Sequence, residues 1–220
     1  MKKKLSQYRE LVEEWDWQKN SKTDINQITY GSRKKFPSNE NLRLFPQSIY
    51  AKTKLQNEIF AKKISKKKSY DLIGLRFFTV YGEWGRPDMF INKLIFSKLK
   101  KKTFFLNNFG NHFRDFTYVD DVVNNILILI NKKFNNKHTI LNICSDNPVS
   151  LKSVLKNLNK AFGKPYIVKR PKQLADVYKT HGSNKKLISI TKYKDFVDIK
   201  VGLSNVIKWA KKNINFLKII

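Results

Sequence analysis

Cysteine, glycine, acidic side chains and long apolar runs are all scarce in this 220-residue chain. The single cysteine, Cys144, excludes a disulfide framework and a cysteine-based zinc site, and we predict no metal site. The longest apolar run, Ile126 to Ile130, is far shorter than the roughly 20 residues that cross a bilayer. Charged residues between Leu5 and Trp17 replace the apolar segment of a secretory signal. We therefore expect a cytoplasmic protein with no membrane partner.

The shortage of acidic residues leaves 45 Lys and Arg against 17 Asp and Glu, a formal net charge of +28. Such an excess is typical of proteins that bind polyanions. However, only seven of the basic residues are Arg, which nucleic-acid readers use for bidentate contacts, and no nucleic-acid motif is present. The lysines are scattered among many Asn and Ile, as an AT-rich genome would encode them. A nucleic-acid partner is therefore not expected.

Alternating strand and helix patterns begin near residue 25 and indicate an α/β fold. In the first helix, the apolar residues Ala51, Leu55, Ile59 and Phe60 are expected to form one buried stripe. The predicted strands cover residues 70–78, 104–106, 116–119, 139–144 and 166–169, and the predicted helices cover 50–63, 89–100, 121–131, 151–162, 183–188 and 201–213.

Several predicted helix ends carry residues that favour helix termination. Ser48, Asp120 and Ser150 precede three of the helices, where a side-chain oxygen accepts a hydrogen bond from a free backbone N–H. Gly163 follows the helix 151–162, as expected for a glycine that ends a helix.

Tyr50 and Lys54 are four residues apart on the first predicted helix, so their side chains lie on one face of it. An ammonium group close to a phenol favours the phenolate form, which a tyrosine base needs near neutral pH. A lysine-rich helix also produces this spacing by chance, so the pair alone is a weak signal.

The stretch Leu72 to Met89 begins as an apolar run typical of a buried strand and ends in a turn that contains Gly82, Gly85 and Pro87. Ligands of open α/β sheets bind beyond the carboxyl ends of the strands. Arg86, between Gly85 and Pro87, has a planar guanidinium that can hold a carboxylate through two hydrogen bonds. The stretch therefore predicts an anion site, and the alternative is a surface arginine in a turn.

Four blocks, in order along the chain, resemble those of the UDP-glucuronate 4-epimerases. These enzymes belong to the NAD-dependent epimerase/dehydratase family of extended short-chain dehydrogenases/reductases. The blocks and their surroundings cover roughly residues 28 to 212. They are Tyr50-Ala51-Lys52-Thr53-Lys54, the stretch Arg76 to Met89, the stretch Arg114 to Asp121, and Leu141 to Ile143 followed by Asn147 to Val149. The resemblance implies the C-terminal part of a Rossmann-like doubly wound sheet plus a small α/β substrate-binding lobe.

The resemblance also implies roles for five residues. Tyr50 would remove the proton from the sugar 4-hydroxyl while a hydride passes from C4 to NAD, and the 4-keto intermediate would then be reduced on its other face. Lys54 would tune Tyr50 and, like Tyr50, contact NAD. Thr79, Arg86 and Arg114 would bind the substrate, with Arg86 on its carboxylate and Arg114 on its nucleotide. The implied partners are UDP-glucuronate or UDP-galacturonate and a second copy of the chain, bound through the Tyr-Lys helix.

Two of these roles have structural alternatives. Thr79 alone also fits simple strand propensity. Arg114 could instead pair with Asp115 or Asp120, which are close to it in the sequence.

Two features of the resembled family are not found in the 220 residues. Relatives carry a hydroxyl residue four positions before Tyr30, where this chain has Asn26, with Thr29 as the nearest hydroxyl candidate. An amide cannot relay a proton as a hydroxyl does. The eight glycines, at positions 31, 74, 82, 85, 110, 163, 182 and 202, form no G-x-x-G-x-x-G turn, on which a dinucleotide pyrophosphate rests. We therefore expect that the N-terminal part of the family fold is missing and that the chain alone binds NAD poorly.

We predict three regions with different roles. Residues 1–24 are a polar segment without a family counterpart, residues 25–80 are a remnant of the dinucleotide-binding domain with the Tyr-x-x-x-Lys helix, and residues 81–220 are mainly the substrate-binding lobe, with 112–145 partly returning to the core. Three functions stay open: an NAD-dependent epimerase with impaired activity as an isolated chain, a sugar-nucleotide-binding protein without catalysis, and a basic protein that binds nucleic acid or an anionic membrane.

Overall fold

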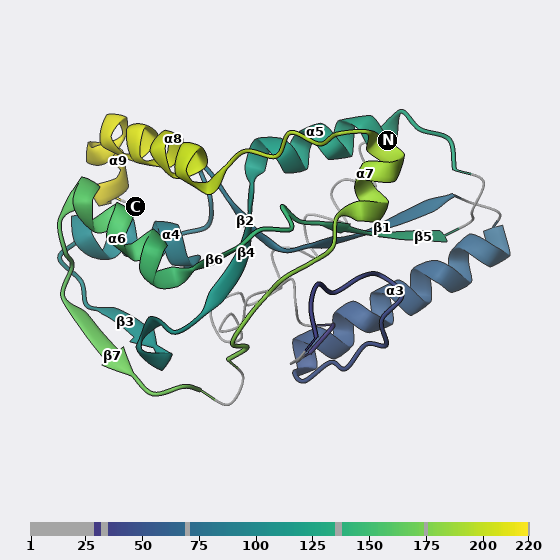
Figure 1. Cartoon of the computed structure of the whole chain (residues 1–220), viewed down its shortest axis with the longest axis horizontal. Helices are drawn as coiled ribbons and strands as arrows, with labels where there is room; N and C mark the ends of the chain where they lie inside the picture. Colours follow the sequence, from purple (N-terminus) through teal and green to yellow (C-terminus); the bar gives the residue numbers. More distant parts are fainter. Residues whose placement is uncertain (1–28, 32–34, 69–70, 135–137, 174–175, 220) are drawn as a thin grey trace.

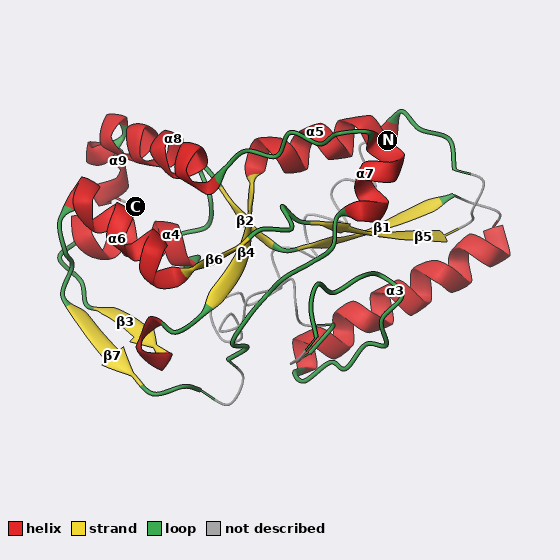
Figure 2. Ribbon diagram, in the orientation of Figure 1, coloured by secondary structure: helices red, strands yellow, loops and turns green. Residues whose placement is uncertain are grey.

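The computed structural model describes residues 29–31, 35–68, 71–134, 138–173 and 176–219. Figure 2 shows that helices and strands alternate along this part of the chain. The helices are α3 (Ile49–Lys68), α4 (Phe90–Leu99), α5 (Val119–Ile130), α6 (Leu151–Phe162), α7 (Lys185–Thr191), α8 (Ile199–Lys212) and α9 (Ile214–Ile219), with a 3-10 turn η1 (Asn108–Gly110). The strands are β1 (Leu72–Phe77), β2 (Thr79–Tyr81), β3 (Phe104–Asn107), β4 (Phe113–Tyr118), β5 (His138–Ile143), β6 (Pro148–Ser150) and β7 (Ile167–Arg170).

The strands form three small sheets that are mostly parallel (Figure 1). β1 pairs with β5 in parallel, with Leu72 opposite His138, and β3 pairs with β7 in parallel, with Phe104 opposite Ile167. In the third sheet, β4 lies between β2 and β6, parallel to β2 and antiparallel to β6. Parallel strands joined through helices confirm the predicted α/β class.

Helices cover both faces of the β1–β5 pair. In Figure 1, α3 lies on one side of this pair, and α5 and α7 lie on the other. Leu141, Ile143 and Leu187 are fully buried between these layers. Cover on both faces agrees with the largely apolar sequence of β1, in which Arg76 is the charged exception.

A second and larger core lies on the other side of the central strands, where α4, α6, α8 and α9 gather (Figure 1). It packs these helices against the β2–β4–β6 sheet and against β3. Its fully or nearly fully buried members include Leu94, Ile95, Phe104, Phe116, Val154, Leu158, Leu203, Val206, Ala210 and Leu217.

Most predicted elements are confirmed, with shifts of a few residues at their ends. Ser48 caps α3, because its Oγ accepts a hydrogen bond from the Ala51 backbone N–H at 3.1 Å. Ser150 does stand at the N-cap of α6, but its side chain makes no capping bond. Gly163 ends α6 with a φ of 75°, as predicted. The prediction for Asp120 was wrong, since α5 begins one residue earlier and Tyr118 occupies its N-cap.

The predicted buried stripe of α3 is only partly correct. Ala51 is fully buried, but Ile59 is 48% exposed and Phe60 is 65% exposed. The side of α3 that faces the β1–β5 pair is instead held partly by a polar contact, between Glu58 and Arg76. Apolar spacing alone does not reveal that an ion pair decides which face of a helix turns inward.

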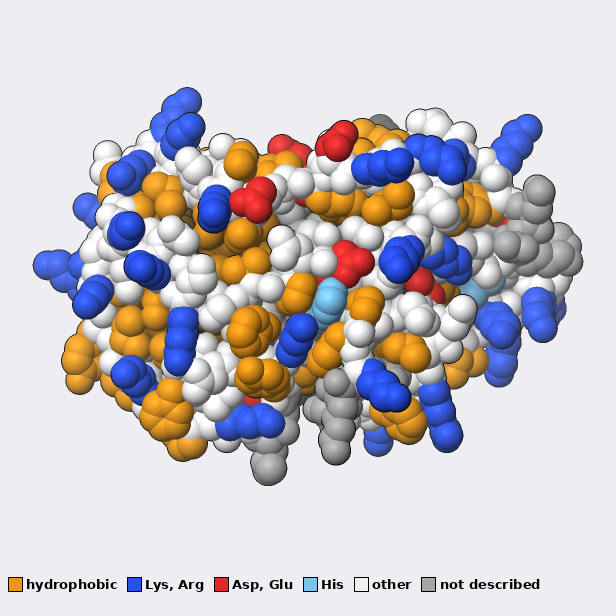
Figure 3. Space-filling model, viewed as in Figure 1, with side chains coloured by type: hydrophobic (Ala, Val, Ile, Leu, Met, Phe, Trp, Pro, Cys, Tyr) orange, Lys and Arg blue, Asp and Glu red, His pale blue; other side chains and the backbone are white. Residues whose placement is uncertain are grey.

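The charged surface agrees with a dispersed distribution of lysine. On the face shown in Figure 3, Lys and Arg side chains are spread over the molecule rather than gathered in one stripe. Within the residues that the structure describes, no helix is both long and apolar enough to cross a membrane.

Candidate functional site

A buried polar network fixes α3, the helix that carries Tyr50, against the β1–β5 pair. Arg76 on β1 holds the Glu58 carboxylate with two hydrogen bonds, Nε to Oε1 at 2.8 Å and Nη2 to Oε2 at 2.7 Å. Its Nη1 donates to the Tyr30 hydroxyl at 2.8 Å, and that hydroxyl donates to Asn142 Oδ1 at 2.7 Å. Burial opposes the charge of Arg76, but the contacts with Glu58 and Tyr30 together outweigh it and keep the Arg76 pKa above its ordinary value.

Tyr50 and Lys54 lie on the same face of α3, as their spacing predicts. The Lys54 Nζ atom is 5.1 Å from the centre of the Tyr50 ring. Tyr50 is half-buried and Lys54 is exposed. The ammonium group therefore lies over the phenol ring and can reach a ligand from the solvent side.

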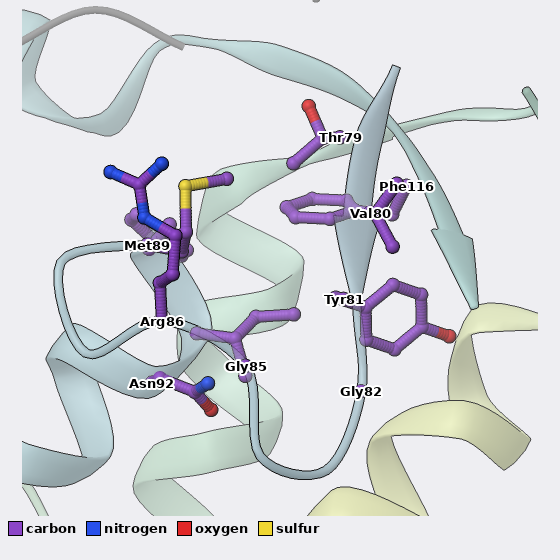
Figure 4. A pocket seen from close by; sticks show the side chains of 11 residues that line it. Thr79, Val80, Tyr81, Gly82, Gly85, Arg86, Met89, Asn92 and Phe116 are labelled. Atoms are coloured by element: carbon purple, nitrogen blue, oxygen red, sulfur yellow. The ribbon is translucent and has the colours of Figure 1, made fainter. Parts of the chain in front are cut away.

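A hollow lies beside β2, between the strand, the glycine turn and the start of α4 (Figure 4). Thr79 and Arg86 both line it, and in Figure 4 they stand on opposite sides of the hollow. The hollow is small and partly open to solvent. Met89, Asn92 and Phe116 also contribute to its wall. A binding site for an anion in this turn stays a prediction.

Glycine is required where the turn crosses α4. A Cβ atom on Gly85 would lie 2.6 Å from the Asn92 Nδ2 atom, so the backbone of the turn packs directly on the amide. Asn92 is only 5% exposed, and its Oδ1 atom has no hydrogen-bond partner within the described part of the chain.

Two side chains on the outer part of the turn hold it against the helical core. Trp84 packs edge-on against Trp209 of α8 at 5.2 Å between ring centres and against Phe216 of α9 at 5.7 Å. The Tyr118 hydroxyl donates to the Glu83 carboxylate at 2.8 and 2.9 Å. Burial, together with this bond to Glu83, raises the pKa of Tyr118 to about 12. The turn is therefore fixed next to Arg86 while the Arg86 side chain stays partly exposed.

Arg86 makes a bidentate ion pair with Asp88, two residues further along the turn. Its Nε donates to Asp88 Oδ1 at 3.0 Å, and its Nη2 donates to Asp88 Oδ2 at 2.6 Å. Both side chains are 40% exposed. The guanidinium thus already binds a carboxylate in the geometry that the sequence predicts for a uronate.

Arg114 lies in a different environment from Arg86. It is 7% exposed on β4, and its Nη1 donates to the backbone carbonyls of Phe113 at 2.9 Å and Tyr178 at 3.4 Å. The neighbouring Asp115 accepts hydrogen bonds from Ser145 and Gly182. A role of Arg114 toward a nucleotide stays a prediction.

The structure brings two of the five predicted site residues to one hollow. Tyr50, Lys54 and Arg114 are not among the residues that line the hollow of Thr79 and Arg86. The action of Tyr50 and Arg86 on one sugar, which the family resemblance implies, therefore stays a prediction. Thr29 is described and is 6% exposed, whereas Asn26, the family's hydroxyl position, lies outside the described residues.

Sequence reasoning missed Asp88 and Asn92 as members of this site. Asp88 could have been found, because a carboxylate two residues from an arginine across a proline is within reach of its guanidinium. Asn92 gave no such signal, since one polar residue on an apolar helix usually faces solvent.

Comparison with known proteins identifies the family. The model of the "NAD dependent epimerase/dehydratase family" matches residues 27–144. The chain belongs to this family. Members of the family depend on NAD, and the relatives of this chain include proteins named UDP-glucuronate 4-epimerase. The family and the Rossmann-like fold predicted from the sequence motifs are confirmed.

Three relatives within or close to this family illustrate the likeness. An uncharacterized protein of Methanocaldococcus jannaschii is 39% identical over 193 residues, which are 86% of this chain and 58% of that protein. UDP-glucuronate 4-epimerase 5 of Arabidopsis thaliana is 35% identical over 198 residues, which are 82% of this chain and 45% of that protein. A third similar protein is the UDP-glucuronic acid 4-epimerase from Bacillus cereus, whose crystal structure is in complex with UDP-glucuronic acid and NAD. Its sequence is 28% identical, the TM-score is 0.77, and the match covers 85% of this chain and 60% of that protein chain. This epimerase-family chain therefore spans less than two thirds of the length of these relatives.

Proposed function

We propose that this chain supplies the acid–base pair and the uronate-binding residues of an NAD-dependent sugar-nucleotide 4-epimerase that acts on UDP-glucuronate or UDP-galacturonate. The observation that carries the proposal is the hollow beside β2, where Arg86 and Thr79 line one space. A guanidinium that holds a carboxylate through two bonds is what distinguishes a uronate from a neutral hexose. Family membership supports the 4-epimerase reaction.

In this proposal each of the five residues has its own role. Tyr50 holds and moves the proton of the sugar 4-hydroxyl, and the Lys54 ammonium favours the phenolate form of Tyr50. Arg86 binds the sugar carboxylate, Thr79 donates to or accepts from a sugar oxygen, and Arg114 contributes to binding of the nucleotide.

The groups on α3 fit the ribose end of NAD. Lys54 presents an exposed ammonium and Tyr50 a half-buried hydroxyl on one helix face, and such donors suit the hydroxyls of a ribose. A bound NAD would supply the acceptor and donor of the hydride at C4 of the sugar. Because the 220 residues contain no G-x-x-G-x-x-G turn, we propose that these residues by themselves bind NAD weakly and turn over substrate little or not at all.

Titration of the purified 220-residue protein with NAD and, separately, with UDP-glucuronate tests both parts of the proposal. We expect saturable binding of UDP-glucuronate and weak binding of NAD. Retention of NAD at nanomolar to micromolar concentrations would contradict the proposed weakness of the cofactor site. Absence of UDP-glucuronate binding would overturn the proposed function, and steeply salt-dependent DNA binding in its place would favour the basic-protein alternative.

Replacement of Arg86 by Gln tests the residue assignment. We expect Arg86→Gln to weaken binding of UDP-glucuronate severalfold, because it removes the bonds to the carboxylate, whose contribution is partly offset by the Arg86–Asp88 pair that they replace. Binding of UDP-glucose, which lacks the carboxylate, should change little. Arg170→Gln is the matched control, because Arg170 lies on β7 over the Phe105 ring and not at the hollow. Equal losses for both ligands in calorimetric titrations would argue against a carboxylate-binding role.

We further propose a cytoplasmic location and a homodimer formed through α3. The helix exposes three large apolar side chains, Ile49 at 81%, Ile59 at 48% and Phe60 at 65%. An apolar patch of this kind is typical of a surface that is covered in the assembled protein.

A further inference from the structure

We propose that Asp88 is a specificity-determining residue that occupies the Arg86 guanidinium until a ligand carboxylate displaces it. The inference rests on the proposed uronate function. The Asp88 carboxylate would compete with the substrate carboxylate for Arg86, which it holds through two hydrogen bonds of 3.0 and 2.6 Å.

The ion pair is local, so it forms whenever the turn is folded. Only Pro87 separates the two residues, and its ring restricts the backbone between them. The turn is closed by a backbone hydrogen bond from Met89 N to Arg86 O at 3.2 Å. Trp84 and Glu83 anchor the preceding residues to the helical core. Asp88 therefore needs no large rearrangement to reach Arg86 in the unliganded protein.

The same pair is weak enough to be exchanged. Both side chains are 40% exposed, so water screens their attraction, and exposed ion pairs contribute little to stability. Arg86 lines the hollow, whereas Asp88 is not among its lining residues. A carboxylate that enters the hollow can thus form both hydrogen bonds with the Arg86 guanidinium while the Asp88 side chain turns to solvent.

This exchange limits how strongly the hollow prefers a uronate. A sugar with a carboxylate gains its bonds to Arg86 only by giving up the Arg86–Asp88 pair, whereas a neutral sugar leaves that pair intact. Asp88 also repels the ligand carboxylate, so its removal should increase the preference for the uronate over the neutral hexose. The UDP part is common to both ligands, and the ratio of their dissociation constants isolates the effect at the carboxylate.

Calorimetric titration of the Asp88→Asn variant with UDP-glucuronate and UDP-glucose tests the inference. We expect UDP-glucuronate to bind about two- to fivefold more tightly than to the unmodified protein, with little change for UDP-glucose. Asp71→Asn is the control with the same change of charge, since Asp71 is an exposed residue that precedes β1 and is not part of the hollow. It should leave the ratio of the two dissociation constants unchanged. Asp88→Ser serves as a second variant if Asp88→Asn does not fold.

The outcomes separate this inference from the proposed function. An unchanged ratio in both Asp88 variants, or weaker binding of UDP-glucuronate, would overturn the inference and indicate that Asp88 orients Arg86 for the ligand. If Arg86→Gln still weakens UDP-glucuronate binding in the same experiment, the proposed function stands without it. If neither Arg86 nor Asp88 affects UDP-glucuronate binding, both proposals fail.

Discussion

Asp115 is a single carboxylate that joins three separate segments of the chain. Its Oδ1 accepts hydrogen bonds from the Ser145 backbone at 3.1 Å and hydroxyl at 2.8 Å, and its Oδ2 accepts one from Gly182 N at 3.0 Å. Its own backbone N–H donates to Thr180 Oγ1 at 2.8 Å. Asp115 is completely buried, and burial raises its pKa to about 6 in spite of these bonds.

The raised pKa of Asp115 predicts a pH dependence of stability. Between about pH 4 and pH 6 the folded protein binds a proton that the unfolded chain has released, so this residue's contribution to the free energy of unfolding falls as the pH rises through that window. The Asp115→Asn variant cannot titrate at this position, and it also loses an acceptor for one of the three bonds, which should cost about 1–3 kcal/mol. We expect the stability advantage of the unmodified protein over the Asp115→Asn variant in urea unfolding to shrink from about pH 4 to about pH 7. A difference that stays constant across this range would contradict the assignment.

At the scale of single residues, the sequence predicts which side chains lie together on one element better than it predicts how deeply a side chain is buried. The spacing of Tyr50 and Lys54 was enough to place them together on one helix face. In contrast, the run Arg114 to Asp121 contains three aspartates, and nothing in it reveals that Asp115 and Asp121 are fully buried while Asp120 is exposed. Their environments depend on hydrogen-bond donors at residues 145, 182, 193 and 197, which lie far away in the sequence.

At the scale of secondary-structure elements, Gly202 controls how α8 packs on the strand that leads to the hollow. A Cβ atom at this position would overlap the hydroxyl and ring of Tyr81 on β2. Gly202 is buried inside a helix, where alanine is normally more favourable by about 1 kcal/mol. The close approach of α8 to β2 therefore requires the absence of a side chain at Gly202.

Replacement of Gly202 by Ala should destabilise the protein in spite of the higher helix propensity of alanine. We expect a net loss of about 1 kcal/mol or more, because overpacking a buried contact costs roughly 1–3 kcal/mol. Ser204→Ala, at an exposed position of the same helix, should cause no loss. The second substitution Tyr81→Phe should restore part of the stability of Gly202→Ala, since it removes one of the overlapped atoms. Thermal unfolding of these variants measures the effects, and a stabilised Gly202→Ala protein would refute the packing argument.

Element positions were predicted well where apolar spacing and capping residues agree. The helix 151–162 is an example, with a serine before it and a glycine after it. The three-residue strand β6 and the short helix α9 were missed, because segments of this length carry too little periodicity to be distinguished from loops. β6 exists because residues 148–150 pair with β4, a tertiary contact that local sequence does not encode.

At the scale of the whole molecule, the exposed apolar side chains of α3 predict assembly. Ile59 and Phe60 lie on the helix that also carries Tyr50, so a dimer formed there would bring the two acid–base helices close to one interface. We expect the unmodified protein to sediment as a dimer. The double substitution Ile59→Ser and Phe60→Ser should convert it to a monomer, because it removes apolar area that the interface would bury.

A matched change elsewhere distinguishes this interface from general apolar association. Leu127 on α5 is 54% exposed, and Leu127→Ser should leave the sedimentation coefficient unchanged. A monomeric unmodified protein, or the loss of the dimer in Leu127→Ser alone, would show that α3 is not the contact surface.

The parallel pairing of β1 with β5 also has a consequence for the order in which the chain acquires its structure. Leu72 and its partner His138 are 66 residues apart, and Phe104 and its partner Ile167 are 63 residues apart. During synthesis, each first strand emerges long before the strand that completes it, and apolar segments such as Leu72 to Phe77 stay without their strand partner in the meantime. Sheets of this kind form slowly because distant segments must meet before any ladder closes. A ribosome that has translated only the first half of this sequence therefore holds a chain that is still exposed to chaperones and proteases, and its survival in the cell depends on how quickly the second half follows.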